Sequence, residues 1–184
     1  MITGHEIRQR VESGEIGITD FTEKQLNPNS YNLKLGDMLK VYMPLGSKNA
    51  IPALDMKGQV ATRNVIIPSD GLLLQPGILY LGSTAEVIDC TKSDLIPCIS
   101  GRSSIGRFGV NIHATAGFGD IGFIGTFTLE IFVVQPVIIY PYIEICQIYF
   151  EESTGDPSVR YKGKYLGQLD PQPSKLYEDF IKEN

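Results

Sequence analysis

A loop rich in glycine, serine and arginine contains the first residues suited to binding chemistry. Residues 101–109 read Gly-Arg-Ser-Ser-Ile-Gly-Arg-Phe-Gly. Glycine permits tight turns and close approach of the backbone to a ligand, and serine hydroxyls donate hydrogen bonds. The guanidinium groups of Arg102 and Arg107 are planar forks that match phosphate oxygens. The loop is therefore a candidate anion site, although a solvated turn with two surface arginines explains its composition equally well.

A glycine-rich segment with a single acid follows this loop. Residues 113–125 read His-Ala-Thr-Ala-Gly-Phe-Gly-Asp-Ile-Gly-Phe-Ile-Gly. The glycines predict a hairpin whose backbone passes close to another group. Asp120 could accept a hydrogen bond from a sugar hydroxyl, or it could close an Asx turn with its own backbone.

One carboxylate stands in an otherwise apolar strand pattern over residues 127–134. Alternation divides this run into two faces, one with Phe127, Leu129, Ile131 and Val133 and the other with Thr128, Glu130 and Phe132. A carboxylate in a partly buried site is suited to proton transfer, whereas on a solvated face it has no such role. The pattern leaves both possibilities for Glu130 open.

The end of the chain has the composition of a mobile arm. Residues 153–172 are polar and rich in glycine and proline, and we expect the arm to cover about residues 153–184. It contains Tyr161, Lys164 and Gln168, whose aromatic, cationic and amide groups could close over a ligand as a lid. The alternative is a solvated tail.

The elements that must position these residues are mostly strands. Short runs rich in Ile, Val, Tyr and Phe are separated by Gly, Pro, Asn and Asp, and they cover residues 31–35, 38–42, 71–74, 78–83, 127–134, 137–140 and 143–150. Thr3 and Glu6 have the spacing of a capping box, which predicts a helix over about residues 3–13. Ser174 predicts the start of a second short helix near the end. We therefore predict one all-β domain over residues 1–184, built as a sandwich, jelly roll or barrel with short terminal helices.

Composition and charge exclude several classes of protein. The net charge is −5 without a basic block, so long nucleic acid is a poor partner, although a small anion is not excluded. No apolar run reaches the roughly 18 residues that span a bilayer, and the polar N-terminus lacks a signal-peptide stretch. The three cysteines form no closely spaced pair, which argues against a disulfide framework. We expect a soluble, cytoplasmic protein with no membrane partner.

Taken in this order, the segments resemble the dCTP deaminase family, which is related to the trimeric dUTPases. The resemblance covers nearly the whole chain, from the N-terminal helix and residues 29–33 (Asn-Ser-Tyr-Asn-Leu) onward. It is most specific in Arg-Ser-Ser-Ile-Gly-Arg, His-Ala-Thr-Ala-Gly-Phe-Gly-Asp, Thr-Leu-Glu and the Tyr, Lys and Gln of the arm. It implies a distorted jelly-roll or β-barrel subunit of the dUTPase-like type, a homotrimer with sites between subunits, and a nucleotide hydrolase with dCTP or dUTP as ligand.

The resemblance also implies a role for each candidate residue. Glu130 would be the catalytic proton carrier, with Ser103 positioning the attacking water and Arg107 assisting. The residues implied to bind substrate are Arg102, Ser103, Ser104, Ile105, Gly106, Arg107, Asp120, Thr128, Leu129, Glu130, Gln147, Tyr161, Lys164 and Gln168.

The metal chemistry implied is magnesium without zinc. Family members bind Mg²⁺ through the nucleotide triphosphate, so no protein side chain is expected to be a metal ligand. Zinc deaminases use H-x-E and P-C-x-x-C elements. Pro97-Cys98 is not followed by a second cysteine at that spacing, and neither His5 nor His113 is followed by x-Glu. Water would then be activated by Glu130 rather than by zinc.

The main expectation for the reaction is conversion of dCTP to dUMP and pyrophosphate, which supplies dUMP for thymidylate synthesis. Residues 116–120 read Ala-Gly-Phe-Gly-Asp. They are nearer the A-G-W-I-D of family members that perform both steps than the bulkier pattern of those that release dUTP. Gly117 would leave room for a second water near the α-phosphate, with Phe118 in place of tryptophan. Alternatives are a monofunctional deaminase releasing dUTP, a dUTPase-like pyrophosphatase that needs no proton shuttle, and a binding protein without turnover.

Overall fold

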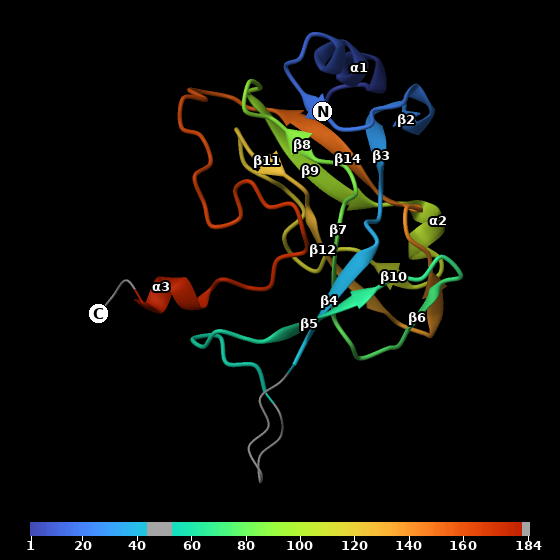
Figure 1. Cartoon of the computed structure of the whole chain (residues 1–184). Coiled ribbons are helices and arrows are strands. Elements are labelled where there is room, and N and C mark those ends of the chain that lie inside the picture. The colour runs from blue at the N-terminus through green and yellow to red at the C-terminus, as the bar shows by residue number, and fades with distance from the viewer. Residues whose placement is uncertain (44–52, 182–184) are drawn as a thin grey trace.

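The computed structural model describes residues 1–43 and 53–181, and Figure 1 shows a β-structure with a helix beyond one end and a long C-terminal segment along one side. The helical elements are α1 (Gly4–Glu12), η1 (Glu23–Gln25), α2 (Ser103–Gly106) and α3 (Tyr177–Ile181). The strands are β1 (Gly17–Ile18), β2 (Leu26–Asn27), β3 (Ser30–Lys34), β4 (Met38–Tyr42), β5 (Thr62–Ile66), β6 (Leu72–Leu74), β7 (Tyr80–Ser83), β8 (Ile88–Asp89), β9 (Leu95–Gly101), β10 (Val110–Asn111), β11 (Ile124–Gly125), β12 (Thr128–Val133), β13 (Val137–Ile139) and β14 (Glu144–Glu152).

The strands form four sheets, in the orders β10-β12-β7-β4-β5, β2-β3-β14-β9, β1-β8-β11 and β13-β6. Every pairing among the described residues is antiparallel. The two larger sheets contribute to one hydrophobic core, in which Leu33 and Ile148 from one sheet and Leu129 and Ile131 from the other are at most 1% exposed. This arrangement confirms the predicted all-β class of the jelly-roll type.

The alternation predicted for residues 127–134 is confirmed in β12. Leu129, Ile131 and Val133 are buried, whereas Thr128 and Glu130 are only partly buried. Because successive side chains of a strand point to opposite faces, burying the apolar set in the core turns Glu130 outward.

The N-terminal helix is close to its predicted bounds, but its cap is simpler. The Thr3 hydroxyl accepts a hydrogen bond from the Glu6 N–H at 3.3 Å, as an N-cap does. The Glu6 carboxylate accepts from Arg10 at 2.8 Å, so the reciprocal half of the predicted capping box does not form. Near the other end, Ser174 Oγ accepts from Leu176 N, and the helix that follows is the short α3.

Strand β9 was not predicted, because Pro97 and Gly101 interrupt its pattern. It nevertheless pairs with β14 from Leu95 to Gly101. It lies at the edge of its sheet, where a proline does not remove a needed ladder hydrogen bond. Strand β9 leads directly into the arginine-serine loop, so it is the element that fixes the start of that loop.

The three cysteines, Cys90, Cys98 and Cys146, are free and buried. Burial raises the pKa of the Cys90 thiol to about 12. No helix in residues 1–43 or 53–181 has the length and apolar character needed to cross a membrane.

Candidate active site

A cavity of about 380 Å³ lies where β7 and β12 meet the glycine-rich segment and the C-terminal arm. Its lining residues are Tyr42, Leu79, Leu81, Ala116, Phe118, Gly119, Asp120, Phe123, Phe127, Thr128, Glu130, Tyr161, Tyr165, Gln168, Gln172 and Ser174. The walls are mainly aromatic and aliphatic, with a few carboxylate, amide and hydroxyl groups among them. This is the usual composition of a small-molecule site, in which polar groups orient a ligand held by apolar contact.

Glu130 is the carboxylate that β12 presents to this cavity. The residue is paired with Leu81 of β7, so the neighbouring strand offers it an apolar side chain. Its Oε2 accepts a hydrogen bond from the Ala114 N–H at 2.8 Å. This bond fixes the carboxylate and leaves Oε1 without a partner among the described residues. Glu130 is therefore held in place with one oxygen available for proton transfer.

The neighbours of Glu130 on β12 have different positions relative to the cavity. Thr128 lines it, and its hydroxyl accepts from the Gln172 N–H at 3.1 Å. Leu129 is 1% exposed and its side chain belongs to the core, so only its backbone could contact a ligand. Asp120 lines the cavity, and its carboxylate forms no hydrogen bond within the described residues, so the Asx turn considered above is not formed.

The arginine-serine loop forms the single helical turn α2 between β9 and β10. Ser103, Ser104, Gly106 and Arg107 are exposed, and Ile105 is partly buried against the core. The N–H groups of Ile105 and Gly106 donate to the Arg102 carbonyl and close the turn. The hydroxyls of Ser103 and Ser104 have no partner among the described residues, so they can bind a ligand from outside the chain.

The two arginines of this loop have different surroundings. The Arg102 guanidinium donates to the Glu144 carbonyl at 2.6 Å and lies 3.0 Å from Glu144 Oε2. Glu144 Oε2 also accepts from Asn32 Nδ2 at 2.8 Å. Arg102 is thus held against β14, whereas Arg107 has no ion pair in the part of the chain that is described. Arg107 is the freer of the two to bind an anion.

Gln147 also holds the start of the loop. Its side-chain amide donates to the Gly101 carbonyl at 3.0 Å and accepts from the Ser30 hydroxyl at 2.8 Å. Ser30 belongs to residues 29–33, one of the segments quoted above for the resemblance. The structure therefore gives this segment a local role, which is to support β14 where it holds the loop.

The C-terminal arm, defined here as residues 153–181, is packed on the body. The Tyr161 N–H donates to the Ile121 carbonyl at 2.8 Å. Gln168 Nε2 donates to the Thr126 carbonyl at 2.6 Å, and its buried Oε1 has no hydrogen-bond partner among the described residues. Lys164 does not line the cavity and lies 2.6 Å from Asp179 Oδ2. Two of the three arm residues singled out from the sequence thus reach the cavity.

Gly117 packs against β9 and does not line the cavity. Its carbonyl accepts from the Ile99 N–H at 2.5 Å, and a Cβ here would lie 3.2 Å from the Ile99 carbonyl and 3.3 Å from the His113 ring. The added atom would face β9 and His113, and Gly117 is not among the cavity-lining residues. The next residue, Phe118, lines the cavity and is 68% exposed. Gly117 therefore permits close packing on β9, and its role beside the α-phosphate stays a prediction.

The predicted site residues form two groups within one chain. Asp120, Thr128, Glu130, Tyr161 and Gln168 line the cavity. The loop residues from Arg102 to Arg107, together with Gln147, do not line it. Figure 1 shows α2 and the C-terminal segment on opposite sides of the β-structure. A single chain does not bring the serines and Arg107 to Glu130.

Sequence reasoning missed several cavity residues. Tyr42 lies on β4, Leu79 directly before β7 and Leu81 on β7. The arm contributes Tyr165, Gln172 and Ser174. The aromatic residue Tyr165 within the polar arm was the available signal. Within residues 1–43 and 53–181, the structure contains no group of three or more His, Cys, Asp or Glu side chains placed to hold a metal ion.

Comparison with known proteins gives a consistent assignment. A family model described as dCTP deaminase-like matches residues 1–153. A protein of Hathewaya histolytica named "dCTP deaminase, dUMP-forming" is 49% identical over 180 residues, which cover 98% of this chain and 99% of that protein. A protein of the same name from Clostridium beijerinckii is 50% identical over 182 residues, covering 99% of each chain.

A solved structure is similar in fold. The 2'-deoxycytidine 5'-triphosphate deaminase of Agrobacterium tumefaciens superposes with a TM-score of 0.61 at 20% identity. The match covers 83% of this chain and 48% of that structure, so this chain spans about half its length. At this identity the likeness concerns the fold alone. The family model and the full-length relatives, together with a cavity built around Glu130, show that this chain belongs to the dCTP deaminase-like family.

Proposed function

We propose that this protein hydrolyses dCTP to dUMP, ammonia and pyrophosphate. The observation that carries the proposal is Glu130, a fixed carboxylate with one unpaired oxygen in an apolar cavity of the size of a small ligand. Relatives with 46–50% identity along the whole chain are named for this activity. The proposal places the enzyme in the cytoplasm, where deoxynucleoside triphosphates are made.

The first step is deamination at C4 of cytosine. Glu130 takes a proton from water, and the resulting hydroxide adds to C4. Glu130 delivers that proton to N3, then takes a proton from the new C4 hydroxyl and passes it to the leaving amino group, which departs as ammonia. One carboxyl group carries every proton, so general acid–base catalysis needs no second titrating side chain here.

The cavity offers separate groups for the rest of the nucleotide. The free carboxylate of Asp120 can accept a hydrogen bond from the 3'-hydroxyl of the deoxyribose. Gln168 Oε1, which is buried and unpaired, can accept a bond from a ligand donor. The rings of Phe118 and Tyr161 give the sugar and base an apolar surface. These contacts hold C4 next to Glu130.

The separation of the loop from the cavity supports a homotrimer whose sites lie between subunits. A neighbouring copy would bring Ser103 and Arg107 to the Glu130 cavity, where the serine positions water and the arginine neutralises phosphate charge. Arg102, which is already paired with Glu144, would instead hold the loop in shape.

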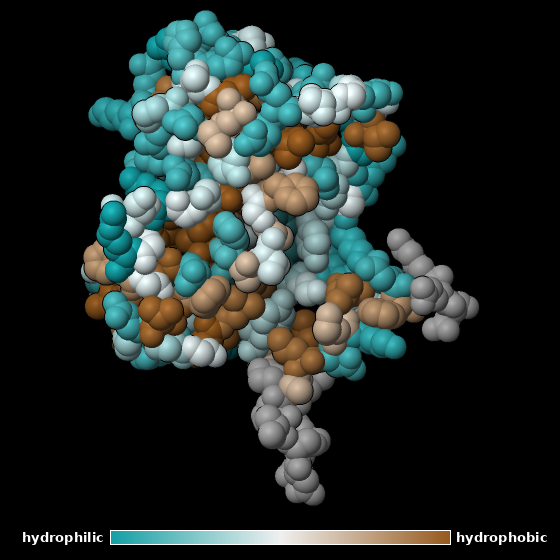
Figure 2. All heavy atoms as spheres, turned by 180° about the vertical axis from the view of Figure 1, so that it is seen from behind, coloured by the Kyte–Doolittle hydropathy of each residue, from teal (hydrophilic) through white to brown (hydrophobic). Residues whose placement is uncertain are grey.

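The surface next to the loop has the character of a subunit contact. Phe108, Val134, Leu73 and Ile138 are exposed by 50–67%. Figure 2, turned by 180° from Figure 1, shows hydrophobic side chains gathered on the lower left of its view, which is the side on which Figure 1 labels β6 and β10. Exposed apolar patches of this kind are typical of protein interfaces.

The second step splits dUTP between its α- and β-phosphates. Water adds to the α-phosphorus, and pyrophosphate leaves as dUMP forms. Mg²⁺ carried by the triphosphate would neutralise phosphate charge, and the few, scattered carboxylates of the cavity suit a metal held by the nucleotide rather than by the protein. No zinc takes part. Release of dUTP would make the protein a monofunctional deaminase, and the names of the relatives favour dUMP.

The decisive experiment is incubation of the purified protein with dCTP and Mg²⁺, followed by chromatography of nucleotides and assay of ammonia. We expect dUMP, pyrophosphate and ammonia in equal amounts. Accumulation of dUTP with ammonia would restrict the activity to deamination. Hydrolysis of dUTP with no action on dCTP would identify a pyrophosphatase and overturn the role of Glu130.

A further inference from the structure

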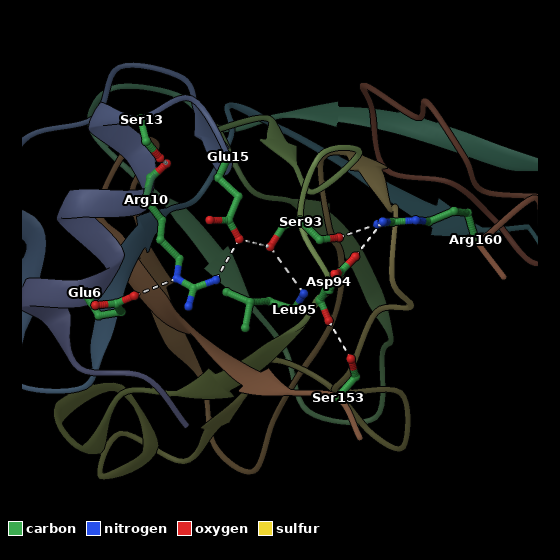
Figure 3. A network of polar contacts seen from close by, with 9 residues as sticks. All are labelled: Glu6, Arg10, Ser13, Glu15, Ser93, Asp94, Leu95, Ser153 and Arg160. Atoms are coloured by element: carbon green, nitrogen blue, oxygen red, sulfur yellow. Dashed lines mark hydrogen bonds and ion pairs between the residues drawn. The ribbon is translucent and has the colours of Figure 1, made fainter. Parts of the chain in front are cut away.

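We propose that Arg160 is a latch that holds the C-terminal arm on the body of the protein and so positions Tyr161 in the cavity. Arg160 Nη2 donates to Asp94 Oδ1 at 2.5 Å, and Nη1 donates to the Ser93 carbonyl. Figure 3 shows the guanidinium reaching both acceptors from the arm. A planar guanidinium can bond two fixed acceptors at once, which gives the contact a defined direction. The inference rests on the proposed function, in which the arm covers the substrate.

On the body side, hydrogen bonds hold Ser93 in place, whereas the Asp94 side chain is 58% exposed. Ser93 is 1% exposed, and its hydroxyl donates to Glu15 Oε1 at 2.9 Å and accepts from the Leu95 N–H at 3.2 Å. Glu15 Oε1 also accepts from Arg10 at 2.7 Å, and Arg10 donates to Glu6 at 2.8 Å. Figure 3 shows this chain of contacts running from α1 to the latch. The carbonyl that receives Arg160 is therefore fixed by the N-terminal helix.

Glycines make room for the arm along the segment it crosses. A Cβ at Gly122 would lie 3.0 Å from Cδ and 3.1 Å from Cβ of Arg160. A Cβ at Gly125 would lie 2.7 Å from the Gln168 carbonyl oxygen. The group predicted to pass close to the glycine-rich segment is thus the arm itself.

The latch acts on the cavity through the next residue. The Tyr161 N–H donates to the Ile121 carbonyl at 2.8 Å, and the Tyr161 ring centroid lies 6.2 Å from that of Phe123. The arm meets the body again at Gln168, where the Thr126 N–H donates to the Gln168 carbonyl at 2.8 Å. Without Arg160, the first of these two attachments keeps the Tyr161 backbone hydrogen bond and the ring contact, and the start of the arm keeps the bond from the Ser153 hydroxyl to the Asp94 carbonyl at 2.9 Å. The arm should then spend more time away from the cavity.

The test compares Arg160→Met with the wild type on dCTP. Methionine keeps most of the apolar chain over Gly122 and removes the charge and both donors. Since the pair is partly exposed, we expect a rise in KM of about 3- to 10-fold, with kcat at saturation within about twofold. Amide hydrogen exchange at Tyr161 and Thr126 should become faster by a similar factor. Arg160→Lys should give an intermediate KM, because a lysine reaches one acceptor at a time.

The matched control is Arg8→Met. Arg8 has the same side-chain exposure as Arg160, 34%, and pairs with Glu23 on the surface at 3.3 Å. This variant should have the KM of the wild type and the same rate of amide hydrogen exchange in the arm. Asp94→Asn should raise KM on its own, and adding it to Arg160→Met should raise KM little further, because both changes break one contact.

Three results would overturn the latch. The first is a KM and an amide hydrogen exchange of the arm in Arg160→Met that both equal those of the wild type. The second is a rise in KM that is matched by a fall in kcat and in the unfolding midpoint. The third is a KM of the Arg160→Met, Asp94→Asn double variant that rises by the full effect of both single changes. If Arg160→Met does not fold, Asp94→Asn carries the same test. Hydrogen exchange reports on the latch without turnover. If the wild type is inactive on dCTP, the proposed function is refuted. If amide hydrogen exchange of the arm is still faster in Arg160→Met than in the wild type, the latch is nevertheless supported.

Discussion

Replacing Glu130 with glutamine should abolish deamination and leave the cavity intact. Glutamine has the shape of glutamate, and its Oε1 can still accept the hydrogen bond that the Ala114 N–H now gives at 2.8 Å. Replacing the carboxylate by a neutral amide oxygen weakens the hydrogen bond from the Ala114 N–H by about 1 kcal/mol, and we expect the fold to remain stable. The amide cannot take a proton from water. Loss of general acid–base catalysis should lower kcat by about 10²–10⁴-fold, which corresponds to roughly 3–5 kcal/mol of activation free energy.

Two measurements separate the chemical loss from a structural one. Ammonia release from dCTP with Mg²⁺ gives kcat, and calorimetric titration of the inactive variant with dCTP gives Kd, which should stay within about threefold of the wild-type KM. Glu23→Gln is the matched control, because Glu23 is an exposed carboxylate paired with Arg8 on the surface. More than half of wild-type turnover in Glu130→Gln would remove Glu130 from the mechanism. An equal loss in Glu23→Gln would show that the assay reports stability.

Four further predictions concern separate parts of the molecule. Activity with Mg²⁺ should survive exhaustive treatment with a zinc-selective chelator, and stoichiometric zinc in active protein would contradict this. Deleting the chain after Val159 should raise KM far more than it lowers the unfolding midpoint, and unchanged kinetics would exclude a lid. Glu144→Gln should weaken the support of Arg102 and raise KM by about threefold, as a steady-state titration would show. Burial and a pKa raised to about 12 keep the Cys90 thiol protonated, so a thiol reagent at pH 8 should label it only after unfolding, and rapid native labelling would refute this.

Local sequence patterns were sufficient to predict the strand that carries Glu130. Alternation in residues 127–134 predicted which side chains enter the core, because a strand repeats every two residues. The pattern left open whether Glu130 lies on a solvated face or in a partly buried site, and the structure shows it partly buried at the cavity. The capping signal of α1 likewise depends on residues three apart, and its N-cap was predicted correctly.

Contacts between distant segments could not be predicted in this way. Arg102 and Glu144 are 42 residues apart, and Arg160 and Asp94 are 66 apart. The sequence shows each arginine, but it does not show which strand or turn will lie next to that arginine once the chain has folded. For Arg102 the resemblance implied contact with the triphosphate or a role in orienting catalytic groups, and the structure adds its ion pair with Glu144, which the local pattern does not indicate. The same limit applies to Gly117, whose contact with β9 the local sequence does not indicate.

The glycine-rich segment over residues 113–125 connects these distant parts. The Ala114 N–H orients Glu130, Gly117 packs on β9, and Gly122 and Gly125 make room for the arm. A side chain at Gly117 would press on the end of β9 that leads into the arginine-serine loop, whereas one at Gly125 would displace the arm. Substitutions a few residues apart should therefore have different effects, the first on kcat through the loop and the second on KM through the lid. Gly117, Gly122 and Gly125 each lie in close contact with another part of the chain, and the last two also have φ angles of 84° and 141°, which favour glycine.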